Sequence, residues 1–301
     1  MIQPPFLKPG NTIGITCPAG YMDYKNAETC IHTLQQWGYD VMVGKTLGSK
    51  SKNYFSAGDE DRCNELQAML DDPGIDAILF GRGGYGLGRI IDRLDFTLFA
   101  EKPKWLIGFS DITVIHARLN RLGIASLHAP MAAAFNDGGF KNKYIQSLKL
   151  VLEGKKMLYE TKPYPYNRTG KARAELVGGN LSLIAHLAGT PDALNTAGKI
   201  LFLEDVGEYL YNVDRMLWQL KRNGAFNQLA GLVLGGFTDM KDTTRRFGKK
   251  TNDVLRDVFA EYNFPVCYRF PVSHDKENVA LKSGGTYSFL VTPAKVQLKE
   301  V

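Results

Sequence analysis

The sequence has few of the residues that build metal sites and disulfide frameworks. Four cysteines, Cys17, Cys30, Cys63 and Cys267, form no C-x-x-C pair, which is typical of reduced cytosolic thiols. No apolar run approaches the roughly 20 residues that cross a bilayer. A charged segment followed by an apolar one, as in a signal peptide, is also missing from the start. We therefore expect a cytoplasmic protein without a metal, a disulfide or a membrane anchor.

A strong excess of charge of one sign is missing as well. The formal net charge is +6, and the densest basic run, Arg245, Arg246, Lys249 and Lys250, is short, with Phe247 as its only aromatic residue. We interpret it as a solvated loop and expect no nucleic-acid partner. The 301 residues, 44% hydrophobic and 23% charged, are typical of a globular protein with two domains.

In the first half of the chain, short apolar runs alternate with helical patterns. The runs 12–16, 39–43, 77–80 and 105–107 are the expected strands, and 25–37, 59–70, 89–94 and the segment after Ile112 are the expected helices. This alternation predicts an α/β domain over residues 1–152, a parallel sheet with helices on both faces. Binding sites in such sheets form beyond the carboxyl ends of the strands.

The character of the sequence changes at residue 153. Residues 153–173 are polar and contain two prolines, which predicts a linker. Over 174–301 we expect a smaller, mixed α+β domain. Its expected helices are 181–187, 213–220 and 253–262, and its expected strands are 199–204, 232–234 and an antiparallel pair at 287–291 and 296–298.

Ser110 follows an expected strand and precedes an expected helix, in Gly108-Phe-Ser-Asp111. A serine at such a turn projects from the rim of the sheet, beside the first amides of the helix, as a nucleophile needs. The pattern is not the G-x-S-x-G elbow, because Ile112 replaces the second glycine. Spacing alone favours the other interpretation, in which Ser110 or Asp111 caps the helix.

A glycine-rich stretch, Gly81-Arg-Gly-Gly-Tyr-Gly-Leu-Gly88, follows another expected strand. It has neither a Walker lysine nor the G-x-G-x-x-G order. Glycines in this arrangement can instead bring backbone N–H groups close to a reacting oxygen. Arg82 within it can bind a carboxylate or form a structural salt bridge.

A serine hydrolase also needs a base and an orienting acid. Of the five histidines, His32, His116 and His186 lie in helical patterns and are expected to be helix-face or packing residues. His128 ends an expected strand and His274 lies in a loop, so both are candidates for a rim. Glu204 and Asp205 end a strand of the second domain. Taken singly, each also fits an ordinary surface or capping role.

Taken together, these segments resemble the LD-carboxypeptidase family, serine peptidases that include muramoyltetrapeptide carboxypeptidase and the microcin C self-immunity peptidases. The matching segments run in order along nearly the whole chain: Pro9 to Ile15, Ser56 to Arg62, Ala77 to Gly86, Pro103 to Thr113, Ser126 to Met131, Gly178 to Leu181, Leu201 to Asp205, Asp214 to Leu217 and Phe270 to His274.

The resemblance implies a class I glutamine amidotransferase-like first domain and an active site in the cleft between the two domains. It implies that Ser110 is the nucleophile, Glu204 the orienting acid and His274 the general base. The implied oxyanion hole consists of the backbone N–H groups of Asp111 and Gly84. We further name candidates for substrate binding: Arg82, Gly83, Tyr85, His128 and Asn180. No cofactor or metal is implied, and the expected assembly is a homodimer.

The implied activity is hydrolysis of the L,D-peptide bond that holds the terminal D-alanine of murein tetrapeptides, free or nucleotide-linked, in cell-wall recycling. One alternative is a self-immunity peptidase that acts on a peptidyl-nucleotide antibiotic. A second, of another class, is a non-catalytic module in which the glycine-rich turn binds phosphate or nucleotide. The sequence departs from the family pattern at Cys17 to Ala19, at Ser273, where glycine is usual, and in the polar segment 279–285. These departures bear on substrate preference.

Overall fold

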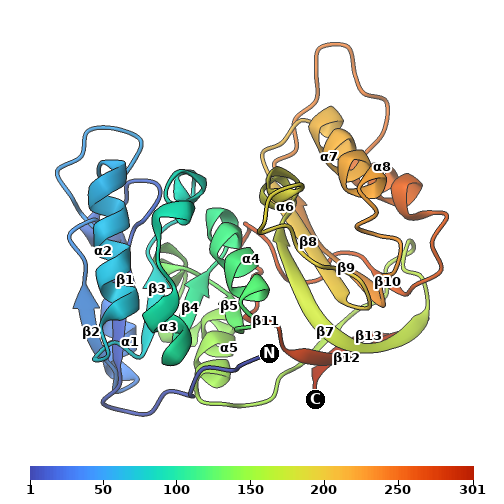
Figure 1. The fold of residues 1–301 in the computed structure, drawn as a ribbon. Coiled ribbons are helices and arrows are strands. Elements are labelled where there is room, and N and C mark those ends of the chain that lie inside the picture. Colours follow the sequence, from blue (N-terminus) through green and yellow to red (C-terminus); the bar gives the residue numbers. More distant parts are fainter. The chain divides into compact units, whose positions relative to one another are not determined.

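The computed structural model describes residues 1–301, and its contacts divide the chain into two compact units. Unit 1 comprises Met1–Lys155 and Val279–Lys282, and unit 2 comprises Lys156–Asn278 and Ser283–Val301. Each unit is built around one sheet (Figure 1). No helix combines the length and the apolar character needed to span a membrane.

The six-stranded sheet of unit 1 has the order β11-β5-β4-β3-β1-β2. Its strands are β1 (Thr12–Thr16), β2 (Asp40–Val43), β3 (Ala77–Phe80), β4 (Trp105–Gly108), β5 (Ser126–His128) and β11 (Leu281–Ser283). The pairs β1–β2, β1–β3, β3–β4 and β4–β5 are parallel. β3 and β4 are buried along their whole length, as expected of strands covered on both faces.

Helices flank the sheet of unit 1 (Figure 1). They are α1 (Glu28–Gln36), α2 (Asp59–Asp71), α3 (Thr97–Glu101), α4 (Thr113–Arg121) and α5 (Lys143–Leu152). The strand order reverses direction between β1 and β3, which is the switch point where ligands bind in doubly wound sheets. The loops that leave β1 and β3 are hydrogen-bonded to each other there, from the amide of Gly20 to the carbonyl of Gly83 at 3.1 Å.

The seven-stranded sheet of unit 2 has the order β10-β9-β8-β7-β12-β13-β6. Its strands are β6 (Leu158–Thr161), β7 (Gly170–Asn180), β8 (Ile200–Val206), β9 (Gly231–Thr238), β10 (Val266–Cys267), β12 (Thr286–Val291) and β13 (Val296–Glu300). β7 to β10 are parallel to one another, whereas β12 pairs antiparallel with β7 and β13, and β13 antiparallel with β6. The predicted mixed α+β character of this region is confirmed.

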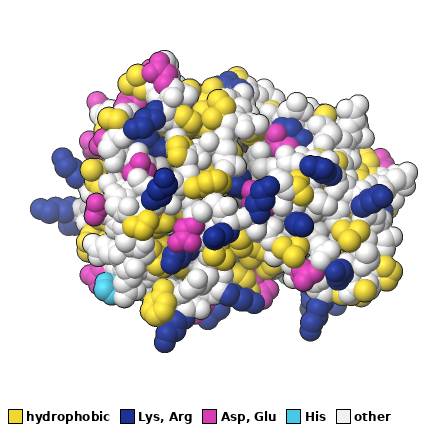
Figure 2. All heavy atoms as spheres, turned by 90° about the horizontal axis from the view of Figure 1, so that it is seen from below, with side chains coloured by type: hydrophobic (Ala, Val, Ile, Leu, Met, Phe, Trp, Pro, Cys, Tyr) yellow, Lys and Arg dark blue, Asp and Glu magenta, His cyan; other side chains and the backbone are white.

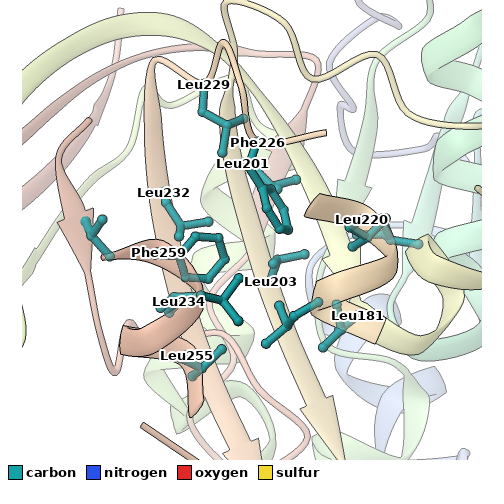
Figure 3. Packing of buried hydrophobic residues seen from close by; sticks show 14 of the residues in the cluster. Leu181, Leu201, Leu203, Leu220, Phe226, Leu229, Leu232, Leu234, Leu255 and Phe259 are labelled. Atoms are coloured by element: carbon teal, nitrogen blue, oxygen red, sulfur yellow. The ribbon is translucent and has the colours of Figure 1, made fainter. Parts of the chain in front are cut away.

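The helices of unit 2 pack beside the parallel half of its sheet (Figure 1). They are α6 (Leu181–Leu187), α7 (Leu210–Arg222) and α8 (Thr251–Phe259). Figure 3 shows their apolar side chains meeting those of β8 and β9 in one buried cluster. This core fixes the strand ends that carry Glu204 and Asp205.

Surface charge is mixed. On the face shown in Figure 2, Lys and Arg side chains are interspersed with acidic and apolar ones. On this face the basic side chains form no continuous track (Figure 2).

Two local expectations differ from the structure. Residues 89–94 form no α-helix but two single 3-10 turns, Leu87–Arg89 and Ile91–Arg93. The segment is too short and starts from Gly86 at φ +148°. Residues 153–173, expected as a linker, contain β6 and the beginning of β7. The charged side chains of β7 alternate with small alanines, so its inward face gives a weak apolar signal.

Candidate active site

Ser110 lies just past the end of β4 and has a strained backbone. Its φ is +65°, a left-handed conformation shared by only two other non-glycine residues. A residue with a Cβ adopts this conformation at a cost of about 1 kcal/mol or more, and such strain concentrates at functional sites. The turn continues into a 3-10 segment, Ser110–Ile112, and then into α4.

The helix-cap interpretation of this turn is wrong. Neither the 3-10 segment nor α4 has a side-chain hydrogen bond at its N-cap. The carboxylate of Asp111 binds elsewhere, accepting the amide hydrogen of Leu87 at 2.8 Å. Ser110 is therefore strained without the compensation that capping would provide.

The glycine-rich turn packs directly against Ser110. A Cβ at Gly83 would lie 2.9 Å from the Cβ of Ser110 and 3.2 Å from the amide nitrogen of Asp111. Gly84 has φ +96°, a conformation that favours glycine. The predicted oxyanion-hole segments, the amide of Asp111 and the turn that carries Gly84, are thus neighbours in unit 1.

In unit 2, Glu204 and His274 form a hydrogen-bonded pair. His274 Nδ1 lies 2.6 Å from Glu204 Oε2. Glu204 is fully buried near the end of β8, and the pairing with β9 shifts register between Leu203 and Asp205. Such an irregularity re-aims a side chain at the end of a strand. Because an ionised carboxylate only accepts, Nδ1 carries the proton, and Nε2 is left as the basic nitrogen.

The two glycines of β9 opposite Glu204 make room for the loop that carries His274. A Cβ at Gly235 would lie 2.1 Å from the carbonyl oxygen of Val272, and one at Gly236 would lie 2.4 Å from the Cβ of Ser273. The loop is braced further by Ser273, whose hydroxyl donates to the carbonyl of Glu277 and accepts the amide hydrogen of Asp275, each at 3.0 Å. Ser273, which stands where the family usually has glycine, therefore stiffens the loop that carries His274.

The charged groups around the pair act on the pKa of His274. Burial of the ring works against its charged form, but the hydrogen bond to Glu204 and the negative charges of Glu204 and Asp205 outweigh burial. The pKa of His274 is accordingly raised above its ordinary value. Burial, together with the charge of Glu204, raises the pKa of Asp205 to about 7.

Asn180 has a structural role in unit 2. It caps α6 through its side-chain oxygen, and its amide donates to Asp205 at 2.9 Å. Asp205 also accepts the amide hydrogen of Ser182 at 3.0 Å. This network joins the ends of β7 and β8, so Asn180 supports the strand that carries Glu204.

The other predicted binding residues lie in unit 1. Arg82 and Tyr85 are exposed on the glycine-rich turn, and Arg82 donates to the carbonyl of Tyr21 at 2.7 Å. His128 is buried, with its ring centroid 5.8 Å from that of Phe109 and 6.2 Å from that of His116. His116 packs as predicted, bonded to Ser126 and to the carbonyl of Gly108, and burial lowers its pKa to about 4.

The side chains show no group of three or more His, Cys, Asp or Glu residues placed to hold a metal ion. The four cysteines are free and buried. Burial, with the charge of Glu65, raises the pKa of Cys17 to about 12. Cys17 is therefore a protonated, unreactive thiol at neutral pH.

Comparison with known proteins covers both units. Residues 13–129 match the model of the LD-carboxypeptidase N-terminal domain, and residues 173–289 match that of the LD-carboxypeptidase C-terminal domain. A probable murein peptide carboxypeptidase of Bacillus subtilis is 32% identical over 94% of this chain and 89% of its own length.

Solved structures of the same family resemble this chain over nearly its whole length. The crystal structure of muramoyltetrapeptide carboxypeptidase from Oxalobacter formigenes superimposes with a TM-score of 0.87 at 30% identity, covering 96% of this chain and 98% of that one. A more distant relative, the microcin C7 self-immunity protein MccF of Escherichia coli, is 25% identical over 91% of this chain and 89% of its own length. The chain belongs to the LD-carboxypeptidase family.

Proposed function

We propose that this protein is a serine carboxypeptidase that hydrolyses the L,D-peptide bond and releases the terminal D-alanine of murein tetrapeptides. The observation that carries the proposal is Ser110, held at φ +65° against the glycine-rich turn. Two relatives that match nearly the whole chain are named for murein peptides, which supports the substrate class.

In this proposal Ser110 is the nucleophile, His274 the general base and Glu204 the acid that orients it. Unit 1 supplies the nucleophile and unit 2 the base, and both act on one substrate. The geometry of the histidine–glutamate pair suits the role, because the 2.6 Å hydrogen bond fixes the tautomer with a basic Nε2.

The reaction has two steps. The hydroxyl oxygen of Ser110 attacks the carbonyl carbon of the bond to D-alanine while His274 Nε2 removes the hydroxyl proton. The tetrahedral intermediate collapses when His274 returns that proton to the leaving amine, so D-alanine departs and an acyl-enzyme remains. Water, deprotonated by His274, then attacks the ester carbonyl, and His274 returns that proton to the oxygen of Ser110 as the serine leaves.

The negative oxygen of each intermediate needs hydrogen-bond donors. We assign this role to the backbone N–H groups of Asp111 and Gly84. One such donor contributes roughly 3–4 kcal/mol to transition-state stabilisation in well-studied enzymes. Arg82, Gly83 and Tyr85 lie on the same turn and are our candidates for contact with the peptide, with Arg82 opposite the terminal carboxylate.

The alternatives receive less support. MccF matches this chain at 25% identity, lower than the 32% of the murein peptide carboxypeptidase relative. A phosphate-binding module does not explain why Ser110 is strained and does not cap its helix. We further propose a cytoplasmic homodimer, which cell fractionation and analytical ultracentrifugation test.

The proposed function is tested by D-alanine release from a murein tetrapeptide, measured for wild type and Ser110→Ala in the presence of EDTA. We expect release by wild type alone. Release by both proteins would show that Ser110 is not the nucleophile. Release by neither, with cleavage of a peptidyl-nucleotide, would move the assignment to the antibiotic substrate.

A further inference from the structure

A single peptide group in the glycine-rich turn is held from both edges by buried charges. The carbonyl oxygen of Gly86 accepts a hydrogen bond from Arg62 Nη1 at 3.2 Å. The amide of Leu87, on the opposite edge of the same planar group, donates to Asp111 Oδ2 at 2.8 Å. Because the peptide is planar, the two bonds together fix its rotation.

Arg62 reaches this peptide from the first turn of α2 and is fully buried. Its guanidinium also donates to the carbonyls of Ala57, at 3.2 Å, and Pro18, and pairs with Asp59. It therefore connects the loop after β1, the start of α2 and the loop after β3. Such convergence uses the planar, multi-donor fork that distinguishes arginine from lysine.

The space for this contact exists because residue 86 is a glycine. A Cβ there would lie 2.7 Å from Arg62 Nη1, and the φ of +148° is one that side chains rarely adopt. The guanidinium also stacks on Phe55, with its carbon 4.8 Å from the ring centroid. Arg62 is therefore enclosed by the turn, by Phe55 and by its hydrogen-bond partners.

Asp111 reaches the same peptide from the residue next to Ser110. Its side chain is almost fully buried, and Oδ1 has no hydrogen-bond partner. An ordinary structural aspartate would satisfy both oxygens. Its hydrogen bond with the amide of Leu87 joins the residue after the nucleophile to the end of the glycine-rich turn.

We propose that Arg62 and Asp111 act as a clamp of positioning residues that holds the glycine-rich turn against Ser110. A turn with four glycines between residues 81 and 86 has many accessible conformations, and few of them aim its amides at a reacting oxygen. Donors stabilise an oxyanion efficiently only when they are oriented in advance. The clamp rests on the proposed function for its catalytic consequence, but its hold on the turn is independent of the reaction.

The test compares Arg62→Met, Asp111→Ala and the double variant with wild type by two measurements. Hydrogen exchange followed by mass spectrometry reports the amides of residues 81–90. Steady-state D-alanine release reports kcat and KM. We expect exchange to become at least about 10-fold faster in each single variant, and kcat to fall roughly 10- to 100-fold with KM within about twofold. Since both residues hold one peptide, the double variant is expected to lose no more activity than the worse single variant.

Lys104→Met is the matched control. Lys104 is a buried cation that donates to two carbonyls, those of Met69 at 3.1 Å and Asp72 at 2.5 Å, next to the other end of β4. We expect its loss to lower thermal stability and to leave exchange at 81–90 and kcat within about twofold. If Arg62→Met or Asp111→Ala does not fold, Arg62→Lys and Asp111→Asn replace them, with smaller changes expected in the same direction.

Unchanged exchange at 81–90 in folded variants would overturn the clamp. Faster exchange with unchanged kcat would overturn its catalytic role, as would a fully additive loss in the double variant. If wild type releases no D-alanine, the proposed function fails, whereas the exchange measurement still decides whether the clamp holds the turn.

Discussion

The proposed site is built mainly from backbone groups in unit 1 and from side chains in unit 2. In unit 1 the site consists of backbone, with a strained serine, glycines in left-handed conformations and a turn that hydrogen-bonds to two buried charged side chains, Arg62 and Asp111. In unit 2 it consists of side chains, a histidine and a glutamate joined by one hydrogen bond. We infer that unit 1 fixes the geometry of the nucleophile and the oxyanion donors, whereas unit 2 controls the protonation of the general base.

The largest effect is expected from Ser110→Ala. Removing the nucleophile should lower kcat by at least about 10⁴-fold, because no other group can form the acyl-enzyme. The left-handed backbone should persist, since alanine retains the Cβ, so thermal stability should change little. D-alanine release and a thermal melt of the same sample check both statements, and activity above about 1% of wild type would contradict the first.

Glu204→Gln tests whether unit 2 controls the protonation of His274. An amide can present its NH₂ group to His274 Nδ1 and favour the wrong tautomer, so kcat should fall about 10³-fold. Glu204 raises the pKa of His274, and a general base must be neutral. The acidic limb of the wild-type kcat/KM profile should therefore have its midpoint above about 6.5, and the residual activity of the variant should have a lower midpoint. An unshifted midpoint would show that Glu204 does not act on His274.

Gly83→Ala tests whether unit 1 must hold the glycine-rich turn closely against Ser110. Its methyl group would press on the Cβ of Ser110 at 2.9 Å, so we expect kcat to fall roughly 10- to 100-fold. Gly58→Ala is the matched control, because its Cβ would meet nothing closer than Asp61 at 3.8 Å. The control should retain activity within about twofold. Equal activities of the two variants would show that the turn need not fit closely against Ser110.

The last effect concerns stability and its dependence on pH rather than catalysis. Asp205 has its folded-state pKa raised to about 7, so the folded protein binds its proton more tightly than the unfolded chain does. Its contribution to stability is therefore lost as pH rises from about 4 to 7, up to about 4 kcal/mol before relaxation. Buried His116, whose pKa is lowered to about 4, acts in the opposite direction.

The measurement is the difference between wild type and Asp205→Asn in urea unfolding at pH 5 and pH 7.5. Wild type should lose more stability than the variant over this interval. A variant that loses as much as wild type would show that Asp205 does not titrate as its burial demands. Enzyme activity need not be known for this comparison.

The sequence predicted unit 1 better than unit 2 because its signals are local. Ser110, the glycines and the buried strands lie within short segments whose spacing indicates strand, turn and helix. His274 and Glu204 are 70 residues apart, and only their resemblance to a family's motifs connected them. The register shift that aims Glu204 comes from pairing with β9, which no periodicity within β8 reveals.

The clamp was not predicted, although a signal for it exists. Arg62 shares the inward face of α2 with Leu66, four residues later, and with Met69, three residues after Leu66. An arginine on an apolar face is rarely buried without a partner. Its partners are backbone carbonyls of distant loops, so they appear only when β1 and β3 become neighbours. Strand β7 was placed partly in a linker for a related reason, since its partners lie far along the chain.

The most direct test of the account is fluorophosphonate labelling of the full-length protein, with the modified residue mapped by mass spectrometry. We predict that Ser110 alone is modified in wild type and that the rate falls at least about 10²-fold in His274→Ala. That result would show that a serine of unit 1 is activated by a histidine of unit 2. Labelling of Ser110 at an unchanged rate in the variant, or labelling elsewhere in wild type, would contradict the account.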